Sequence, residues 1–139
     1  MATALTHNTR PTVGAAVWIG RMLSGLAIAF LAIDVGGKLI ASAMMIANSP
    51  PLGLPDSAAF YQLLGGILAV CTLLYAVPRT AIFGAVLLTG YLGGAVAIHL
   101  RVGSPLLGFT LFGVYLGLLV WGGLWLRNPA LRALFPVVK

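Results

Sequence analysis

Six polar or charged side chains interrupt long apolar stretches of this 139-residue sequence and are its candidates for chemistry: Asp34, Lys38, Gln62, Tyr91, His99 and Arg101. Asp34 and Lys38 lie four residues apart, acid before base, so on a helix they share one face and can form an ion pair. Tyrosine, histidine and aspartate can exchange protons with a bound molecule, and lysine and arginine can stabilise an anion. The pattern predicts a polar ligand-binding pocket, and we assign no catalytic residue.

The composition around these residues is that of a membrane protein. Only 7% of the residues are charged and 60% are hydrophobic, whereas a soluble domain is about 25% charged. The net charge of +6 comes from basic residues scattered singly along the chain, so it does not indicate nucleic-acid binding. A single cysteine, Cys71, excludes an intramolecular disulfide and a CxxC redox centre. With two histidines and no glutamate, we predict no metal site.

Four apolar segments are long enough to cross a bilayer, which takes about 20 helical residues. We expect them at about 13–38, 58–77, 80–100 and 106–126, forming an all-α integral membrane four-helix bundle that is a single domain over residues 1–139. Only Pro78 and Arg79 separate the second span from the third, so these two helices must be neighbours. Residues 48–57 contain three prolines and are expected to form the one long loop.

Basic residues predict the orientation of the bundle. Four spans place both chain ends on one side, and six basic residues belong to that side: Arg10, Arg21, Arg79, Arg127, Arg132 and Lys139. The positive-inside rule therefore predicts that both termini are cytoplasmic. We also expect the first span to be retained, because no typical signal-peptide cleavage site follows it.

Helical rise places the candidate residues in the outer half of the membrane. Asp34 lies roughly 20 Å along its helix from Arg21, and Tyr91 about 18 Å from Arg79. Gln62, His99 and Arg101 are also expected near the outer face. The shared depth of these polar side chains, which we call the polar layer, favours the prediction of a pocket open to the outer face. The alternative is that Asp34 pairs with Lys38 or Arg101 only to hold the first and third helices together.

Small residues recur at intervals of four on two helices. Gly90 and Gly94 form one GxxxG pattern in the third span, and Gly113 and Gly117 form another in the fourth. Such stripes let helices approach closely. They predict tight packing within the bundle or between copies of the chain, with a glycine-lined cavity for a flat apolar ligand as a further possibility.

Several motifs of this sequence resemble those of the DoxX-like family of small four-helix bacterial membrane proteins. The motifs are Gly90-Tyr91-Leu92-Gly93-Gly94-Ala95-Val96-Ala97, His99-Leu100-Arg101-Val102-Gly103, Pro105-Leu106, Leu74-Tyr75, Pro78-Arg79-Thr80, Ser24-Gly25 with Asp34 and Lys38-Leu39, and Trp121-Gly122-Gly123-Leu124 with Leu126-Arg127. The resemblance covers about residues 15–136 and is most specific in the third helix.

The resemblance implies a multi-pass protein of the bacterial cytoplasmic (inner) membrane. Relatives in the wider group are linked to quinone-coupled redox complexes, including the membrane subunit of thiosulfate:quinone oxidoreductase, and others to membrane-protein assembly. Together with the polar layer, this favours a redox-associated subunit that binds a quinone or similar apolar ligand in the outer-leaflet pocket. We expect an accessory role more than an enzymatic one, with no intrinsic cofactor.

Two alternatives stay open. One is a non-enzymatic assembly or interaction factor, which the glycine stripes and aromatic helix ends would suit. The other is a small proton-coupled permease in which Asp34 titrates, and this would need a dimer because four helices enclose little space. The expected partners are the lipid bilayer, a redox enzyme or another membrane protein, and a second copy of the chain through the glycine stripes.

Overall fold

The computed structural model describes residues 14–134, and every regular element among them is a helix. The long helices are α1 (Ala15–Leu39), α4 (Ala58–Ala76), α5 (Ala81–Arg101) and α6 (Phe112–Arg127), and a π-helical turn, η1 (Leu106–Thr110), precedes α6. With Leu106–Arg127 counted as one segment, four helices are long and apolar enough to cross a membrane. The predicted four-helix membrane bundle is therefore confirmed. Arg10, Val13 and Lys139 of the predictions lie outside the described residues.

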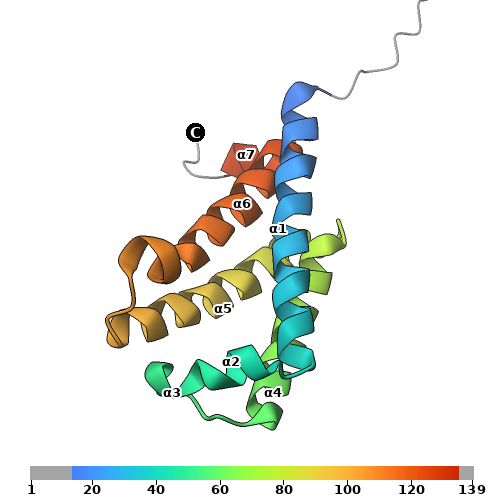
Figure 1. The fold of residues 1–139 in the computed structure, drawn as a ribbon. Helices are drawn as coiled ribbons and strands as arrows, with labels where there is room; N and C mark the ends of the chain where they lie inside the picture. The colour runs from blue at the N-terminus through green and yellow to red at the C-terminus, as the bar shows by residue number, and fades with distance from the viewer. Residues whose placement is uncertain (1–13, 135–139) are drawn as a thin grey trace, which may run out of the picture.

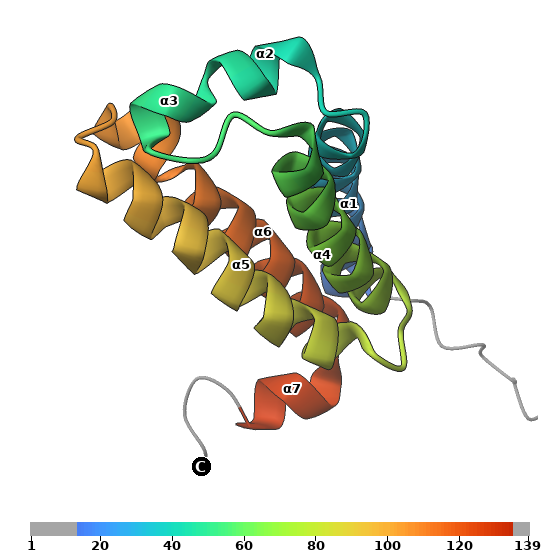
Figure 2. The same ribbon diagram turned by 90° about the horizontal axis from the view of Figure 1, so that it is seen from below.

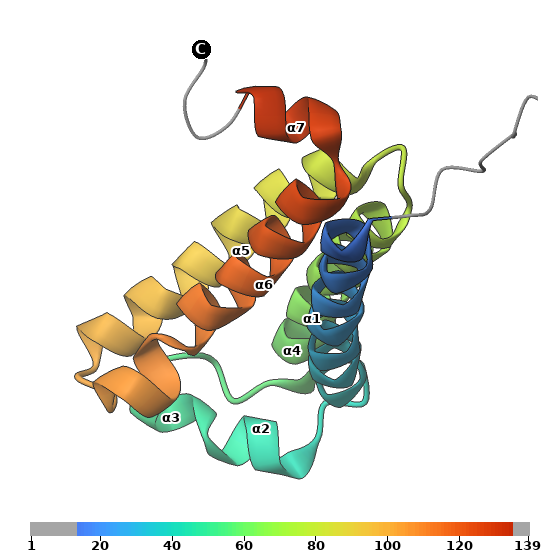
Figure 3. The ribbon, with the colours of Figure 1, turned by 90° about the horizontal axis from the view of Figure 1, so that it is seen from above.

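The four long helices form a ring in which each packs against two neighbours. α1 contacts α4 and α6, and α5 contacts the same two helices from the other side (Figure 1). Figures 2 and 3 show two arms, α1 with α4 and α5 with α6, that converge near the α4–α5 connection and diverge toward the opposite end. The short helices α2 (Ala43–Ala47) and α3 (Ser49–Leu52) run across the divergent end, and α7 (Pro129–Leu134) follows α6 at the convergent end.

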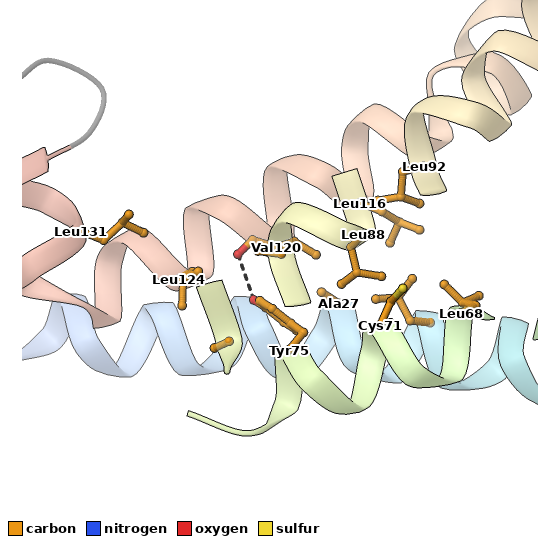
Figure 4. Close-up of a cluster of buried hydrophobic side chains, with 13 residues drawn as sticks. Ala27, Leu68, Cys71, Tyr75, Leu88, Leu92, Leu116, Val120, Leu124 and Leu131 are labelled. Carbon is orange, nitrogen blue, oxygen red and sulfur yellow. Dashed lines mark hydrogen bonds between the residues drawn. The ribbon is translucent and has the colours of Figure 1, made fainter. Parts of the chain in front are cut away.

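We call the convergent end the basic end, because it carries the described basic residues of the predicted cytoplasmic side: Arg21, Arg79, Arg127 and Arg132. Tyr75 is fully buried near this end. Its hydroxyl forms hydrogen bonds of 2.9 Å with the Ser24 hydroxyl and with the Val120 carbonyl, and Figure 4 shows the second of these. One side chain of α4 therefore ties α1 and α6 together. A membrane interior has no water that could replace these bonds.

Glycines allow the closest approach of α1 and α6 at the same place. A Cβ atom added at Gly123 would lie 2.8 Å from the Ser24 nitrogen and 3.0 Å from the Gly20 oxygen. A Cβ added at Gly20 would lie 2.8 Å from the Gly123 oxygen. Any side chain at either position would force the two backbones apart, so these glycines fix the crossing of α1 and α6.

The predicted glycine stripes take only a small part in this packing. Gly113 contacts α5, since an added Cβ would lie 3.0 Å from the Leu92 oxygen. Open space surrounds the other stripe positions, Gly90, Gly94 and Gly117, and also Gly93 beside them, since nothing lies within 4 Å of an added Cβ. Among the stripe positions, only Gly113 takes part in close helix packing within the described chain, and packing between copies of the chain stays a prediction.

A buried apolar cluster fills the space between the helices (Figure 4). Its labelled members are Ala27, Leu68, Cys71, Tyr75, Leu88, Leu92, Leu116, Val120, Leu124 and Leu131. Large apolar side chains also cover the outside of the bundle: Met22 is 71% exposed and Ile33 73%. The spanning helices therefore contact the lipid bilayer through their outer faces.

The segment expected to be the one long loop is partly helical. α3 is a single turn with Pro50 near its start, where the missing proline N–H removes no helical hydrogen bond. Gly53 ends this turn with φ of 66°, a left-handed conformation that glycine adopts without strain. Prolines at 50 and 51 thus begin a helix here, so the expectation of a loop over residues 48–57 is wrong for this part of the segment.

A pair of neighbouring glycines on α6 tests the packing of α1 and α6. Gly123→Ala should lower the free energy of unfolding by about 1–3 kcal/mol, because the new methyl group overpacks the contact with Ser24. Gly122→Ala is the control, since nothing lies within 4 Å of its added Cβ. Reversible denaturation in detergent micelles measures both. Equal effects of the two substitutions would contradict the assigned crossing.

Candidate functional site

A cavity of about 720 Å³ lies at the divergent end of the bundle, which we call the cavity end. All four spanning segments contribute to its wall, together with residues of α2 and α3. Most of the lining is apolar; the polar lining residues are Asp34, Lys38, Asn48, Tyr61, Tyr91 and His99. Its volume falls in the range of small-molecule sites, about 300–1,000 Å³.

Four of the six predicted site residues line this cavity, namely Asp34, Lys38, Tyr91 and His99. Gln62 is exposed on α4 and does not line it. Arg101 is also exposed and donates a hydrogen bond of 2.8 Å from Nη2 to the Leu52 carbonyl. The structure thus brings together residues of α1 and α5 and leaves Gln62 and Arg101 outside the group. Ligand binding by these residues stays a prediction.

Asp34 and Lys38 form the ion pair that their spacing predicts. Lys38 Nζ donates to Asp34 Oδ1, within α1 and one helical turn apart. The Lys38 side chain is 15% exposed and the Asp34 side chain 38%. The pair neutralises two charges that would be costly in the bilayer if they were separate. Both partners belong to α1, so this ion pair does not join the first and third helices.

Tyr91 and His99 bring unused hydrogen-bonding groups to the α5 wall. His99 Nδ1 lies 3.0 Å from the Ser104 hydroxyl, and its ring centroid lies 6.2 Å from that of Phe109. Its Nε2 has no hydrogen-bond partner among the described residues, and neither has the hydroxyl of Tyr91. Each of these groups can therefore bond to a molecule in the cavity.

Tyr61 also lines the cavity, although it is not among the six residues predicted from the sequence. It is 5% exposed, and its hydroxyl forms a hydrogen bond of 2.6 Å with Ser49, which is itself fully buried. The buried face of α4 runs through Tyr61, Gly65, Leu68 and Tyr75 at helical spacing. That periodicity would have selected Tyr61, whereas membrane depth alone selected its neighbour Gln62.

Residues 43–54, which we call the cover, close the cavity end. Met44, Met45, Leu52 and Leu54 of the cover line the cavity. The cover is attached to α4 by the bond between Ser49 and Tyr61 and to α5 by the bond from Arg101 to Leu52. Arg101 therefore positions the cover and does not face the cavity.

The chemistry of the site suits a mainly apolar molecule with polar oxygens. Apolar walls would hold a flat ring, while the ion pair, Tyr91 and His99 could bond to its oxygens. Among residues 14–134, no group of three or more His, Cys, Asp or Glu residues could hold a metal ion.

These features define a small multi-pass membrane protein whose four spanning segments surround a ligand-sized cavity at one end. A model of the DoxX-like family matches residues 22–123, and the chain belongs to that family. The resemblance inferred from the motifs is therefore confirmed. The matched region includes Asp34, Lys38, Tyr91 and His99. No curated protein and no solved structure matches the chain.

The role of Arg101 can be tested by hydrogen exchange. Arg101→Gln removes the bond to Leu52, so amides of the cover should open more often, by about fivefold if the bond contributes about 1 kcal/mol. Arg79→Gln is the control, an exposed arginine at the basic end. Mass-spectrometric exchange in detergent micelles measures both variants. Unchanged protection of the cover in Arg101→Gln would contradict this role.

Proposed function

We propose that this protein is a redox-associated membrane subunit that binds a quinone, or a similar flat apolar carrier, in the cavity. One observation carries the proposal: a largely apolar cavity of about 720 Å³ whose wall includes an ion pair, a tyrosine and a histidine. A quinone combines an apolar ring and tail with two carbonyl oxygens, so it requires this mixture of surfaces.

The polar lining residues match the chemistry of a quinone oxygen. The Tyr91 hydroxyl and a His99 ring N–H can donate to the oxidised form, and Lys38 can stabilise negative charge that develops on reduction. Asp34 and His99 can supply or accept the accompanying protons. The electrons would come from a partner redox enzyme, so the proposed role is that of an accessory subunit.

The cavity has an apolar wall that reaches the lipid-facing surface. Phe109 of η1 lines the cavity and is nevertheless 61% exposed, and the nearby Leu107 is 72% exposed. A ligand dissolved in the bilayer could enter past this turn and leave its tail there. This route supports a membrane-soluble ligand over a water-soluble one.

We further propose that the protein lies in a bacterial cytoplasmic membrane with both termini in the cytoplasm. In support, Arg21, Arg79, Arg127 and Arg132 lie at the end opposite the cavity. The positive-inside rule assigns such an end to the cytoplasmic face. The cavity would then open in the outer leaflet.

Quinone binding can be measured by calorimetric titration of the detergent-solubilised protein with a short-tailed ubiquinone. Asp34→Asn and His99→Ala should each weaken binding by about tenfold, the effect of losing one charge-assisted or well-buried hydrogen bond. Tyr91→Phe should weaken it less, because the ring remains. Gln62→Ala is the matched control, since Gln62 lies on α4 at similar depth but outside the cavity. The proposal would be refuted if all four variants bound the quinone with the affinity of the wild-type protein.

The alternative role as an assembly or interaction factor rests on a different surface. Gly90 and Gly93 are exposed on α5 with nothing within 4 Å of an added Cβ. Exposed apolar side chains, including Phe83 and Val86, continue the same helix. A helix of a second copy or of another membrane protein could pack closely there.

Gly93→Leu tests this surface. If α5 carries the interface, the substitution should abolish a dimer or the co-purification of a membrane partner, because the leucine side chain blocks close helix approach. Gly25→Leu is the control, an exposed glycine of α1 that also has open space. Cross-linking in native membranes reads out both variants. Cross-links that survive Gly93→Leu would exclude α5 as the interface.

A further inference from the structure

A second cavity, of about 280 Å³, lies at the basic end, away from the proposed quinone site. Its wall combines α1, the α4–α5 connection and the end of α6, through residues that include Arg21, Pro78, Ala81 and Arg127. The close α1–α6 crossing adjoins it, since a Cβ added at Gly20 would lie 2.9 Å from the Arg127 nitrogen.

Arg127 has buried donors that nothing in the described chain satisfies. Its Nε and Nη2 atoms are buried and have no hydrogen-bond partner among residues 14–134. The guanidinium lies over the Tyr75 ring, with Cζ 5.5 Å from the ring centroid. That contact stabilises the face of the guanidinium and does not bond the N–H groups of Nε and Nη2. Buried donors without acceptors are costly, so they point to an acceptor that binds here.

No acidic side chain can supply that acceptor. The sequence has two acidic residues, Asp34 and Asp56. Both lie at the cavity end of the bundle. Asp34 lines the 720 Å³ cavity there, and Asp56 lies just before the start of α4. Arg21 borders the small cavity beside Arg127, and its guanidinium lies 5.4 Å from the Trp18 ring centroid. Two cations thus share one cavity with no acidic side chain to offset their repulsion.

We propose that this cavity binds a phosphate group, carried by an anionic phospholipid or present as free phosphate. The planar guanidinium of arginine matches phosphate with paired hydrogen bonds. Asn128 also lines the cavity; its Oδ1 accepts from the Leu131 N–H, which leaves its Nδ2 free to donate to the phosphate. The first residue of α5, Ala81, lines it too, so the positive end of that helix dipole adds to the attraction.

The bound phosphate would bond to side chains of two helices that already pack closely against each other. Arg21 belongs to α1 and Arg127 to α6, so one phosphate bonded to both would reinforce the α1–α6 crossing from outside the apolar core. The site uses none of the residues of the quinone proposal, and either proposal can fail without the other.

The test measures thermal unfolding and native mass spectra of the full-length protein in a neutral detergent. The probes are phosphatidylglycerol, phosphatidylcholine and inorganic phosphate, each added to delipidated protein. The wild-type protein should retain phosphatidylglycerol and unfold at a higher temperature with it than with phosphatidylcholine. Arg21→Gln and Arg127→Lys should each weaken retention by about tenfold, the lysine because it keeps the charge but loses the paired geometry.

Arg132→Gln is the control, because it removes one charge at the same end from an exposed position outside the cavity. Retention that inorganic phosphate does not displace would support the site with a lipid as the source. Stabilisation by inorganic phosphate alone, lost in Arg21→Gln, would support the site with free phosphate as the source. Equal losses in Arg132→Gln and Arg21→Gln, or no stabilisation by any probe, would overturn the proposal.

Discussion

The packing at the basic end determines the shape of the rest of the molecule. Gly20 and Gly123 let α1 and α6 touch through their backbones, and the buried Tyr75 hydroxyl connects α4 to both helices. Helices are stiff rods, so arms that meet this closely at one end and cross at an angle must separate at the other. The cavity occupies the space between the separated arms, and the cover closes it. The site therefore follows from small residues that lie far from it.

The bilayer sets the second constraint, because a polar group in hydrocarbon must find its partner within the protein. Most polar side chains of the spans have such a partner. Thr72 and Thr89 bond to carbonyls of their own helices, and Asp34 pairs with Lys38. Tyr91 at one end and Arg127 at the other keep donors without partners among the described residues. Such exceptions carry information in a membrane protein, and each of them borders a cavity.

The features that could be predicted from the sequence are those that depend on the residue pattern within a single helix. Hydropathy located the four spans, and the i,i+4 spacing predicted the pair of Asp34 and Lys38, because both are properties of one helix. The expected depth of Gln62 did not show that this side chain would lie outside the cavity, because depth in the membrane does not determine which way a side chain faces. The sequence could not predict the bond from Arg101 to the Leu52 carbonyl, because Leu52 belongs to a segment whose prolines indicated a loop. Spacing also could not distinguish Gly123, which packs against α1, from Gly93, where an added Cβ would have nothing within 4 Å.

A small change in the angle of the α1–α6 crossing would move the ion pair at the cavity, because the two lie far apart on the same helix. Gly20 and Asp34 are 14 residues apart on one continuous helix, a length of about 21 Å. A rotation of α1 by about five degrees about the crossing would move Asp34 by roughly 2 Å over that length. The same rotation would shift Lys38 relative to Tyr91 and His99, which α5 carries on the other arm. The cavity volume therefore depends on the α1–α6 crossing at the basic end and on the contact of Gly65 with Lys38, which holds α4 against α1 at the cavity end.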